Sequence, residues 1–243
     1  MSTSSPSSQP RRFSRRWVEC VADIDPDRYE RMVRMTEARR TLKISPRLQE
    51  LIYVAVDLQV AHLYPDGAEV HIVAAIDRGA TVVEVVEAME ISAGLTYRSL
   101  STSLAIVAST YGVTAADAAT TDHQDLDLLR IWPDLGTAGE RLLPEVLPSL
   151  IAYVSAPDRE KTLSDEWRAL ITVAVLASPA ISDDAAVGRA TAWCRELGIE
   201  VEDVAQAIFC GSLIGTHSFT RGYPSLVAAS RLDRDRYSLG IVD

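Results

Sequence analysis

Two histidines and a glutamate stand close enough in the sequence to perform acid–base chemistry at one site. His62 and His71 bracket a segment that joins two expected helices, and Glu50 lies on the helix before it. An imidazole changes its charge near neutral pH, so either histidine can donate or accept a proton during a reaction. Because the segment connects packed helices, both imidazoles can point into the crevice where Glu50 is presented. We expect His62, His71 and Glu50 to be catalytic residues.

Three further side chains near this site are candidates for binding a substrate. Arg98 is the candidate to hold a carboxylate, because a guanidinium offers two parallel hydrogen bonds. Tyr64 can donate a hydrogen bond to an oxyanion, and Glu69 lies between the two histidines. Glu50 has two candidate cationic partners, Arg47 three residues before it and Arg98 across the proposed pocket. These residue types are suited to a small-molecule substrate that carries a carboxylate.

Each of these residues also has an ordinary structural interpretation. A histidine near a helix start is often bonded to neighbouring backbone, and an aromatic residue before a proline, such as Tyr64, is often a loop anchor. Glu50 and Arg98 can equally be solvated residues of a helix surface. Two histidines nine residues apart do not supply the four close ligands of a structural zinc site. We expect no cofactor and no metal, with a bound metal as the alternative.

Helices must position these residues, and the sequence carries the signals that begin and end them. In the first half of the chain, apolar residues recur at helical spacing and β-branched alternation is rare. Ser45 and Pro46 are typical N-cap and N1 residues for the helix that carries Glu50. Gly79 is suited to the C′ position of the next helix, and Thr81 begins a capping box for the one after.

The same signals return in the second half of the chain at a constant offset. Ser164 minus Ser45 is 119, and Gly198 minus Gly79 is also 119. Apolar pairs match at that offset as well, including Leu51-Ile52 with Leu170-Ile171. A fixed offset without gaps is typical of a duplicated unit. The sequence therefore predicts an all-α protein built from two tandem copies of one helical unit.

The composition of the connecting segments suggests where the copies begin and end. Residues 115–143 are richer in Asp, Thr, Gly and Pro, which favours a linker with one short helix around 123–130. The twin arginine near the N-terminus is not followed by the apolar stretch that an export signal needs. The expected organisation is a disordered tail (1–25), a first repeat (26–114), a linker (115–143), a second, degenerate repeat (144–232) and a C-terminal tail (233–243).

Several segments of the first copy resemble the carboxymuconolactone decarboxylase and alkyl hydroperoxidase D-like superfamily. They are the run from Ser45 to Ile52, the run from His71 to Thr81, the run Val85 to Met89 and the pair Ala93-Gly94. The resemblance implies two tandem copies of an alkyl hydroperoxidase D-like helical unit. It also implies that the glutamate near the start of its helix faces the active site.

Peroxidase members of this superfamily carry a Cys-x-x-Cys-x-x-x-His motif, in which a thiolate attacks the peroxide. Counting back from His71, Tyr64 and Gly67 stand where the two cysteines would be. The matching positions of the second copy hold Asp183 and Ala186. The protein is therefore not expected to be a thiol peroxidase.

Decarboxylase members of the superfamily also lack the cysteines, and His62, Glu69 and His71 resemble that branch. The resemblance implies a cofactor-independent lyase, most simply a decarboxylase acting on a small organic acid or a carboxymuconolactone-like lactone. Such a reaction needs an electron sink in the substrate and an acid that protonates the developing enolate. Two alternatives stay open: a lactone hydrolase or isomerase on the same fold, and a non-catalytic small-ligand-binding or scaffold protein.

Composition excludes several other classes of protein. The formal net charge of −10 would repel a phosphate backbone, so we expect no nucleic acid as partner. No apolar run approaches the roughly 20 residues that span a bilayer, so we expect no membrane association. Cys20, Cys194 and Cys210 show no CxxC spacing and fit a reducing cytoplasm. Because relatives with one unit per chain commonly form rings of six units, the resemblance implies a homo-oligomer, specifically a trimer.

Overall fold

The structure is a computed structural model that describes residues 10–113, 127–156 and 159–230. Every regular element within these ranges is a helix, which confirms the all-α prediction. The chain forms two compact units, one made of residues 1–43 and 213–243 and the other of residues 44–212. In the described part of the chain, no helix is both long enough and apolar enough to cross a membrane.

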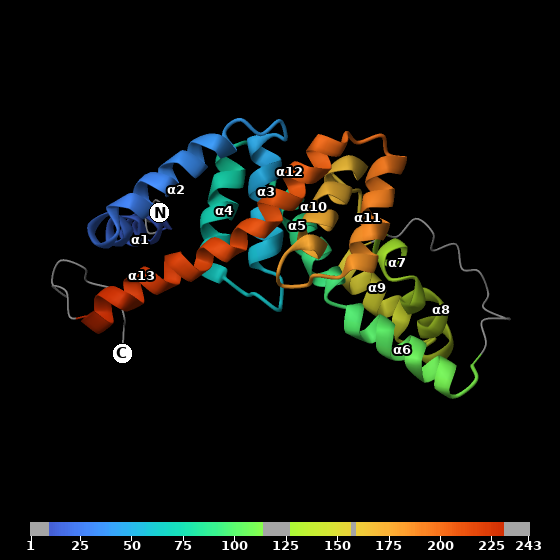
Figure 1. Cartoon of the computed structure of the whole chain (residues 1–243). Coiled ribbons are helices and arrows are strands. Elements are labelled where there is room, and N and C mark those ends of the chain that lie inside the picture. Colours follow the sequence, from blue (N-terminus) through green and yellow to red (C-terminus); the bar gives the residue numbers. More distant parts are fainter. Residues whose placement is uncertain (1–9, 114–126, 157–158, 231–243) are drawn as a thin grey trace, which may run out of the picture. The chain divides into compact units, whose positions relative to one another are not determined.

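The larger unit, residues 44–212, contains the helices that carry the expected site (Figure 1). In chain order they are α3 (Pro46–Asp57), α4 (Pro65–Asp77), α5 (Val82–Leu95), α6 (Arg98–Thr110), α7 (Asp127–Ile131), α8 (Pro133–Leu142), α9 (Leu147–Ser155), α10 (Asp165–Ala177), α11 (Asp184–Glu196) and α12 (Val201–Ser212). Helices α3 and α10 pack against each other and against α5 and α12. Most residues of α3 and α10 are buried, so these two helices form the centre of the unit.

The predicted helix signals operate as expected around the site. Ser45 Oγ accepts a hydrogen bond of 3.2 Å from the amide of Leu48 and caps α3. Thr81 and Glu84 form the capping box of α5. Gly79 ends the preceding helix with a φ of 86°, a backbone conformation that favours glycine. These local bonds fix where α3, α4 and α5 begin and end.

Helix boundaries repeat at the offset that the sequence suggested. Helix α4 covers residues 65–77, and adding 119 gives 184–196, the bounds of α11. The starts of α3, α5 and α6 map in the same way onto the starts of α10, α12 and α13 (His217–Ser230). Even the left-handed residue before α4, Leu63 with φ 38°, has a counterpart in Ser182 with φ 48°. This agreement is what a duplicated unit would produce.

The smaller unit contains α1 (Pro10–Ile24), α2 (Pro26–Arg39), the 3₁₀ turn η2 (Leu213–Thr216) and α13. Helix α1 packs on α2 and α13, and Asp25 caps α2 while accepting a hydrogen bond of 2.9 Å from the Tyr223 hydroxyl. The expectation of a disordered tail over residues 1–25 is therefore wrong for residues 10–24. The apolar residues Cys20 and Val21 are buried, and such burial stabilises a helix that a short polar segment would not form alone.

The compact units do not follow the predicted repeat boundaries. Helices α7 and α8 occupy residues 127–131 and 133–142 of the expected linker, while residues 114–126 lie outside the described ranges. Helix α6, the last of the first copy, packs on α8, and α13, the last of the second copy, packs on α1. Within each compact unit, the closing helix of one copy thus packs on a helix that lies outside both predicted repeats.

Candidate active site

One stripe of helix α3 presents three polar side chains toward α4. Glu50, Tyr53 and Asp57 are spaced by three and four residues, which places them on one face of the helix. All three side chains are buried, and α4 packs along this face. Buried carboxyl groups need partners, because water no longer solvates them. Helix α4 supplies those partners.

Glu50 is held by two side chains, one from α4 and one from the residue that caps its C-terminal end. Its Oε2 lies 2.7 Å from Nδ1 of His71, and its Oε1 lies 3.4 Å from a guanidinium nitrogen of Arg78. The histidine and the arginine are seven residues apart, so they share one face of α4. The imidazole also lies against the Tyr53 ring, with 4.7 Å between ring centroids. The structure therefore brings together Glu50 and His71 as predicted and adds Arg78 to them.

Asp57 provides a second acidic group beside His71. Burial raises the pKa of the Asp57 carboxyl to about 7, and the nearby charge of His71 opposes this rise. The His62 Nε2 atom lies 3.8 Å from Asp57 Oδ1, which is an ion-pair distance when the imidazole is protonated. Burial lowers the pKa of His62. At neutral pH this pair therefore holds both a protonated and an ionised population of the Asp57 carboxyl.

Tyr64 and Gly67, which stand at the positions of the peroxidase cysteines, pack closely against Asp57 and His62 in this structure. Tyr64 is buried and lies edge-on to His62, with 6.1 Å between ring centroids. A Cβ atom added at Gly67 would lie 2.4 Å from Asp57 Oδ2 and 2.5 Å from the Tyr64 ring. Only glycine fits there without displacing the Asp57 carboxyl. This position has no room for a cysteine side chain.

The structure does not gather every predicted residue at this cluster. Arg98 is exposed, and its guanidinium pairs with Asp183 Oδ2 at 2.8 Å and with the carbonyl of Ile181 at 3.3 Å. Its predicted place beside Glu50 is wrong, because a carboxylate of the second copy holds it. Arg47 likewise bonds to the carbonyl of Gly79 at 3.1 Å.

Glu69, the remaining substrate-binding candidate, is exposed on the second turn of α4. It lies two residues before His71, and residues two apart do not face each other on a helix. Glu69 therefore does not share the face of α4 that meets Glu50.

The second copy lacks this acid–base cluster. Adding 119 to the cluster positions gives residues that are apolar or small and neutral: Ala169, Thr172, Leu176, Ala190 and Leu197 stand for Glu50, Tyr53, Asp57, His71 and Arg78. Proton transfer needs titratable side chains, and none stands at these positions. The chemistry of the cluster thus belongs to the first copy alone.

Sequence reasoning missed Asp57 and Arg78, although helical spacing relates each of them to an identified residue. Asp57 lies seven residues after Glu50, and Arg78 lies seven residues after His71, so each shares a face with a residue that was identified. The spacing alone did not show which arginine near the site contacts Glu50. The packing of α3 on α4 shows that Arg78 does so.

Comparisons with known proteins agree with this fold. No protein-family model matches the chain, and no curated protein matches it at significant similarity. Among solved structures, a provisionally assigned gamma-carboxymuconolactone decarboxylase subunit from Burkholderia xenovorans LB400 is similar, with a TM-score of 0.73 and 20% sequence identity. The match covers 93% of this chain and 99% of that chain. The likeness confirms the fold that the sequence resemblance implied.

Proposed function

We propose that this protein is a cofactor-independent lyase, a decarboxylase that acts on a small organic acid or lactone at the Glu50–His71 pair. The observation that carries the proposal is the hydrogen bond of 2.7 Å between Glu50 and His71 Nδ1. The Glu50 side chain is 8% exposed and that of His71 is 25% exposed, so the imidazole is the member that a substrate can reach. The fold shared with a provisionally assigned decarboxylase subunit supports the same reaction class.

The geometry supports a role for His71 as the proton donor. An ionised Glu50 accepts the Nδ1 proton, which leaves Nε2 as the ring nitrogen that exchanges protons with a substrate. When carbon dioxide leaves, the electrons of the broken C–C bond pass into the carbonyl sink of the substrate and form an enolate. The His71 imidazolium then delivers a proton to the enolate carbon. Glu50 stabilises the imidazolium before that step, and solvent returns the proton afterwards.

The neighbouring residues have supporting roles in this proposal. The Arg78 guanidinium is 43% exposed beside the pair and is the cation that we assign to hold the substrate carboxylate in place of Arg98. The Asp57 carboxyl, with its pKa raised to about 7 by burial, is a second proton source close to His62. Asp57 lies on the face of α3 that meets α4, and Arg78 lies seven residues after His71 on the same side of α4.

The test measures carbon dioxide released from lactone acids, beginning with gamma-carboxymuconolactone, while ring opening is followed by proton NMR. We expect carbon dioxide release. The His71→Ala variant should lower kcat about a hundredfold or more, a typical effect of removing a general acid. Arg78→Gln should chiefly raise KM. Asp183→Asn, at the second-copy position that matches Tyr64, keeps its helix cap and should have the wild-type rate.

The alternatives give different results in the same experiment. Ring opening without carbon dioxide would identify a lactone hydrolase, and an unchanged substrate across the panel would favour a binding or scaffold protein. Wild-type rates in both His62→Ala and His71→Ala, with circular dichroism showing intact folds, would place the site elsewhere. A raised KM in Arg98→Gln but not in Arg78→Gln would restore the carboxylate anchor that the sequence suggested.

A further inference from the structure

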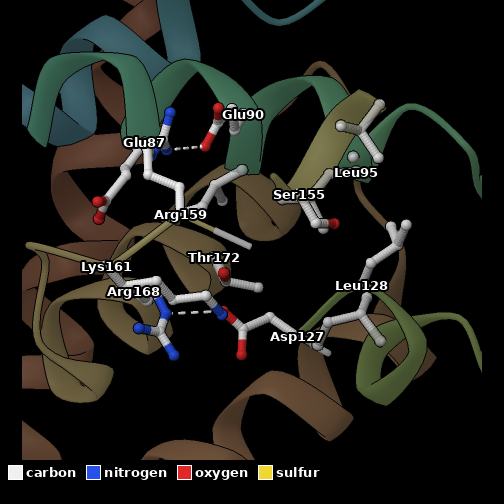
Figure 2. A pocket seen from close by; sticks show the side chains of 14 residues that line it. Glu87, Glu90, Leu95, Asp127, Leu128, Ser155, Arg159, Lys161, Arg168 and Thr172 are labelled. Atoms are coloured by element: carbon white, nitrogen blue, oxygen red, sulfur yellow. Dashed lines mark hydrogen bonds and ion pairs between the residues drawn. The ribbon is translucent and has the colours of Figure 1, made fainter. Parts of the chain in front are cut away.

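A polar pocket lies in the larger unit, between helices α5, α7, α9 and α10 (Figure 2). It is partly open to solvent. Figure 2 shows charged side chains, among them Arg159, Lys161 and Arg168, on one side of the pocket, and Leu95 and Leu128 on the other. A pocket with one apolar wall and one charged wall is suited to a ligand of the same two-sided character.

The carboxylates of this pocket already have strong donors. Glu90 pairs with the guanidinium of Arg159, and Asp127 Oδ2 accepts a hydrogen bond of 2.7 Å from Arg168 Nε. Lys161 differs from these cations, because its Nζ forms an ion pair with the same Asp127 oxygen at the longer distance of 3.8 Å. That distance is too long for a hydrogen bond. The pocket therefore has more donor capacity than its own carboxylates use.

Comparison of the two copies shows that one of these charges is not needed to support the backbone. Arg168 donates to the carbonyl of Leu163 at 3.3 Å. At the positions 119 residues earlier, Gln49 donates to the carbonyl of Ile44 at 3.0 Å. A neutral amide thus makes the same contact in the first copy.

The same comparison applies to the buried glutamate of the pocket. Glu87 accepts a hydrogen bond of 2.8 Å from the amide of Leu163, and 119 residues later Gln206 accepts one of 3.2 Å from the amide of Ile44. The glutamine again shows that a neutral side chain can hold this backbone. Burying charge costs free energy that a neutral residue avoids. Support of the backbone therefore does not explain why Glu87 and Arg168 are charged residues in this pocket.

We propose that this pocket binds a small monocarboxylate with an apolar body, at a site separate from the Glu50–His71 pair. The carboxylate accepts hydrogen bonds from Lys161, and the apolar body lies against Leu95 and Leu128. An anion is the complement because the carboxylates of the pocket are already occupied by donors while Lys161 is not within hydrogen-bond distance of Asp127. The proposal does not depend on the decarboxylase function, since binding here needs no chemistry.

The experiment titrates the full-length protein with sodium hexanoate by isothermal titration calorimetry, with hexanol and hexylamine as uncharged and cationic controls. Hexanoate should bind with an affinity that neither control matches. Lys161→Gln should raise the Kd for hexanoate about tenfold or more, since a hydrogen bond to a charged group contributes roughly 1.5–3 kcal/mol. Arg195→Gln removes an exposed cation of α11 outside the pocket and should leave the Kd unchanged.

Two further variants locate the site. Ser155→Phe fills the pocket from the end of α9 and should abolish hexanoate binding while circular dichroism stays native. His71→Ala should bind hexanoate as the wild type does. Equal affinity for hexanoate, hexanol and hexylamine, or a wild-type Kd in both Lys161→Gln and Ser155→Phe, would overturn the proposal. Binding lost only in His71→Ala would also overturn it and would assign the ligand to the proposed catalytic site.

Discussion

Asp57 is a carboxyl group that the folded chain keeps partly protonated at neutral pH. Its pKa in an unfolded chain is 3.8, and burial raises it to about 7 in the folded protein. Between these values the folded state binds a proton that the unfolded state releases. The stability of the fold must therefore decrease as the pH rises through this window, and the full cost is present above pH 7.

Asp57→Asn should remove this pH dependence. Relative to the variant, the wild type should lose about 3 kcal/mol of unfolding free energy between pH 5 and pH 8, as the pKa shift implies. Urea unfolding at the two pH values measures the difference. Asp77→Asn, which changes an exposed carboxylate at the end of α4, should keep the wild-type slope. Parallel pH profiles for wild type and Asp57→Asn would contradict the shift.

The candidate site could be predicted from the sequence only in part. Glu50 and His71 were identified because a family resemblance and helical spacing agreed on them. The pairing of Arg98 with Glu50 was predicted wrongly, because its partner in the structure, Asp183, lies 85 positions later and belongs to the other copy, which no local pattern reveals. Arg78 was missed because its contact with Glu50 depends on how α4 packs on α3.

Helix ends were more predictable than helix partners. The helix caps at Ser45 and Thr81 and the left-handed backbone at Gly79 depend on contacts within a few residues. The local sequence is therefore enough to predict them. Helix α1 was missed because the packing that supports it involves α13, about 200 positions away. Local propensity in an arginine-rich segment gave no sign of that contact.

Helices α10 and α12 approach each other at a glycine. A Cβ atom added at Gly211 would lie 2.2 Å from the backbone oxygen of Ala174, and a backbone atom cannot move aside as a flexible side chain can. Gly211→Ala should therefore separate the two helices and reduce the unfolding free energy by about 1–3 kcal/mol. Chemical denaturation monitored by circular dichroism measures this change.

Gly188 offers the matched control, because it lies within α11 and an added Cβ meets nothing within 4 Å. Alanine is favoured over glycine in a helix interior by about 1 kcal/mol. Gly188→Ala should consequently raise the unfolding free energy, opposite in sign to Gly211→Ala. The same sign for both variants would show that close packing at Gly211 is not the cause.

At the scale of the whole molecule, we propose that the chain assembles as a trimer. Two helical units per chain would give six units in such a trimer, the number that the sequence resemblance implies. Light scattering at micromolar concentration should give three times the mass of one chain at neutral pH. A monomeric mass would exclude the assembly.

Helix α1 packs on α13, which lies nearly 200 residues later in the sequence. A ribosome releases α1 early but makes α13 only after nearly 200 further residues, which takes on the order of ten seconds or more at ordinary elongation rates. During that interval, α1 has no helix α13 to cover its apolar residues Cys20 and Val21. The nascent chain must therefore carry α1 without this partner until α13 has been made, and the smaller unit can form only then.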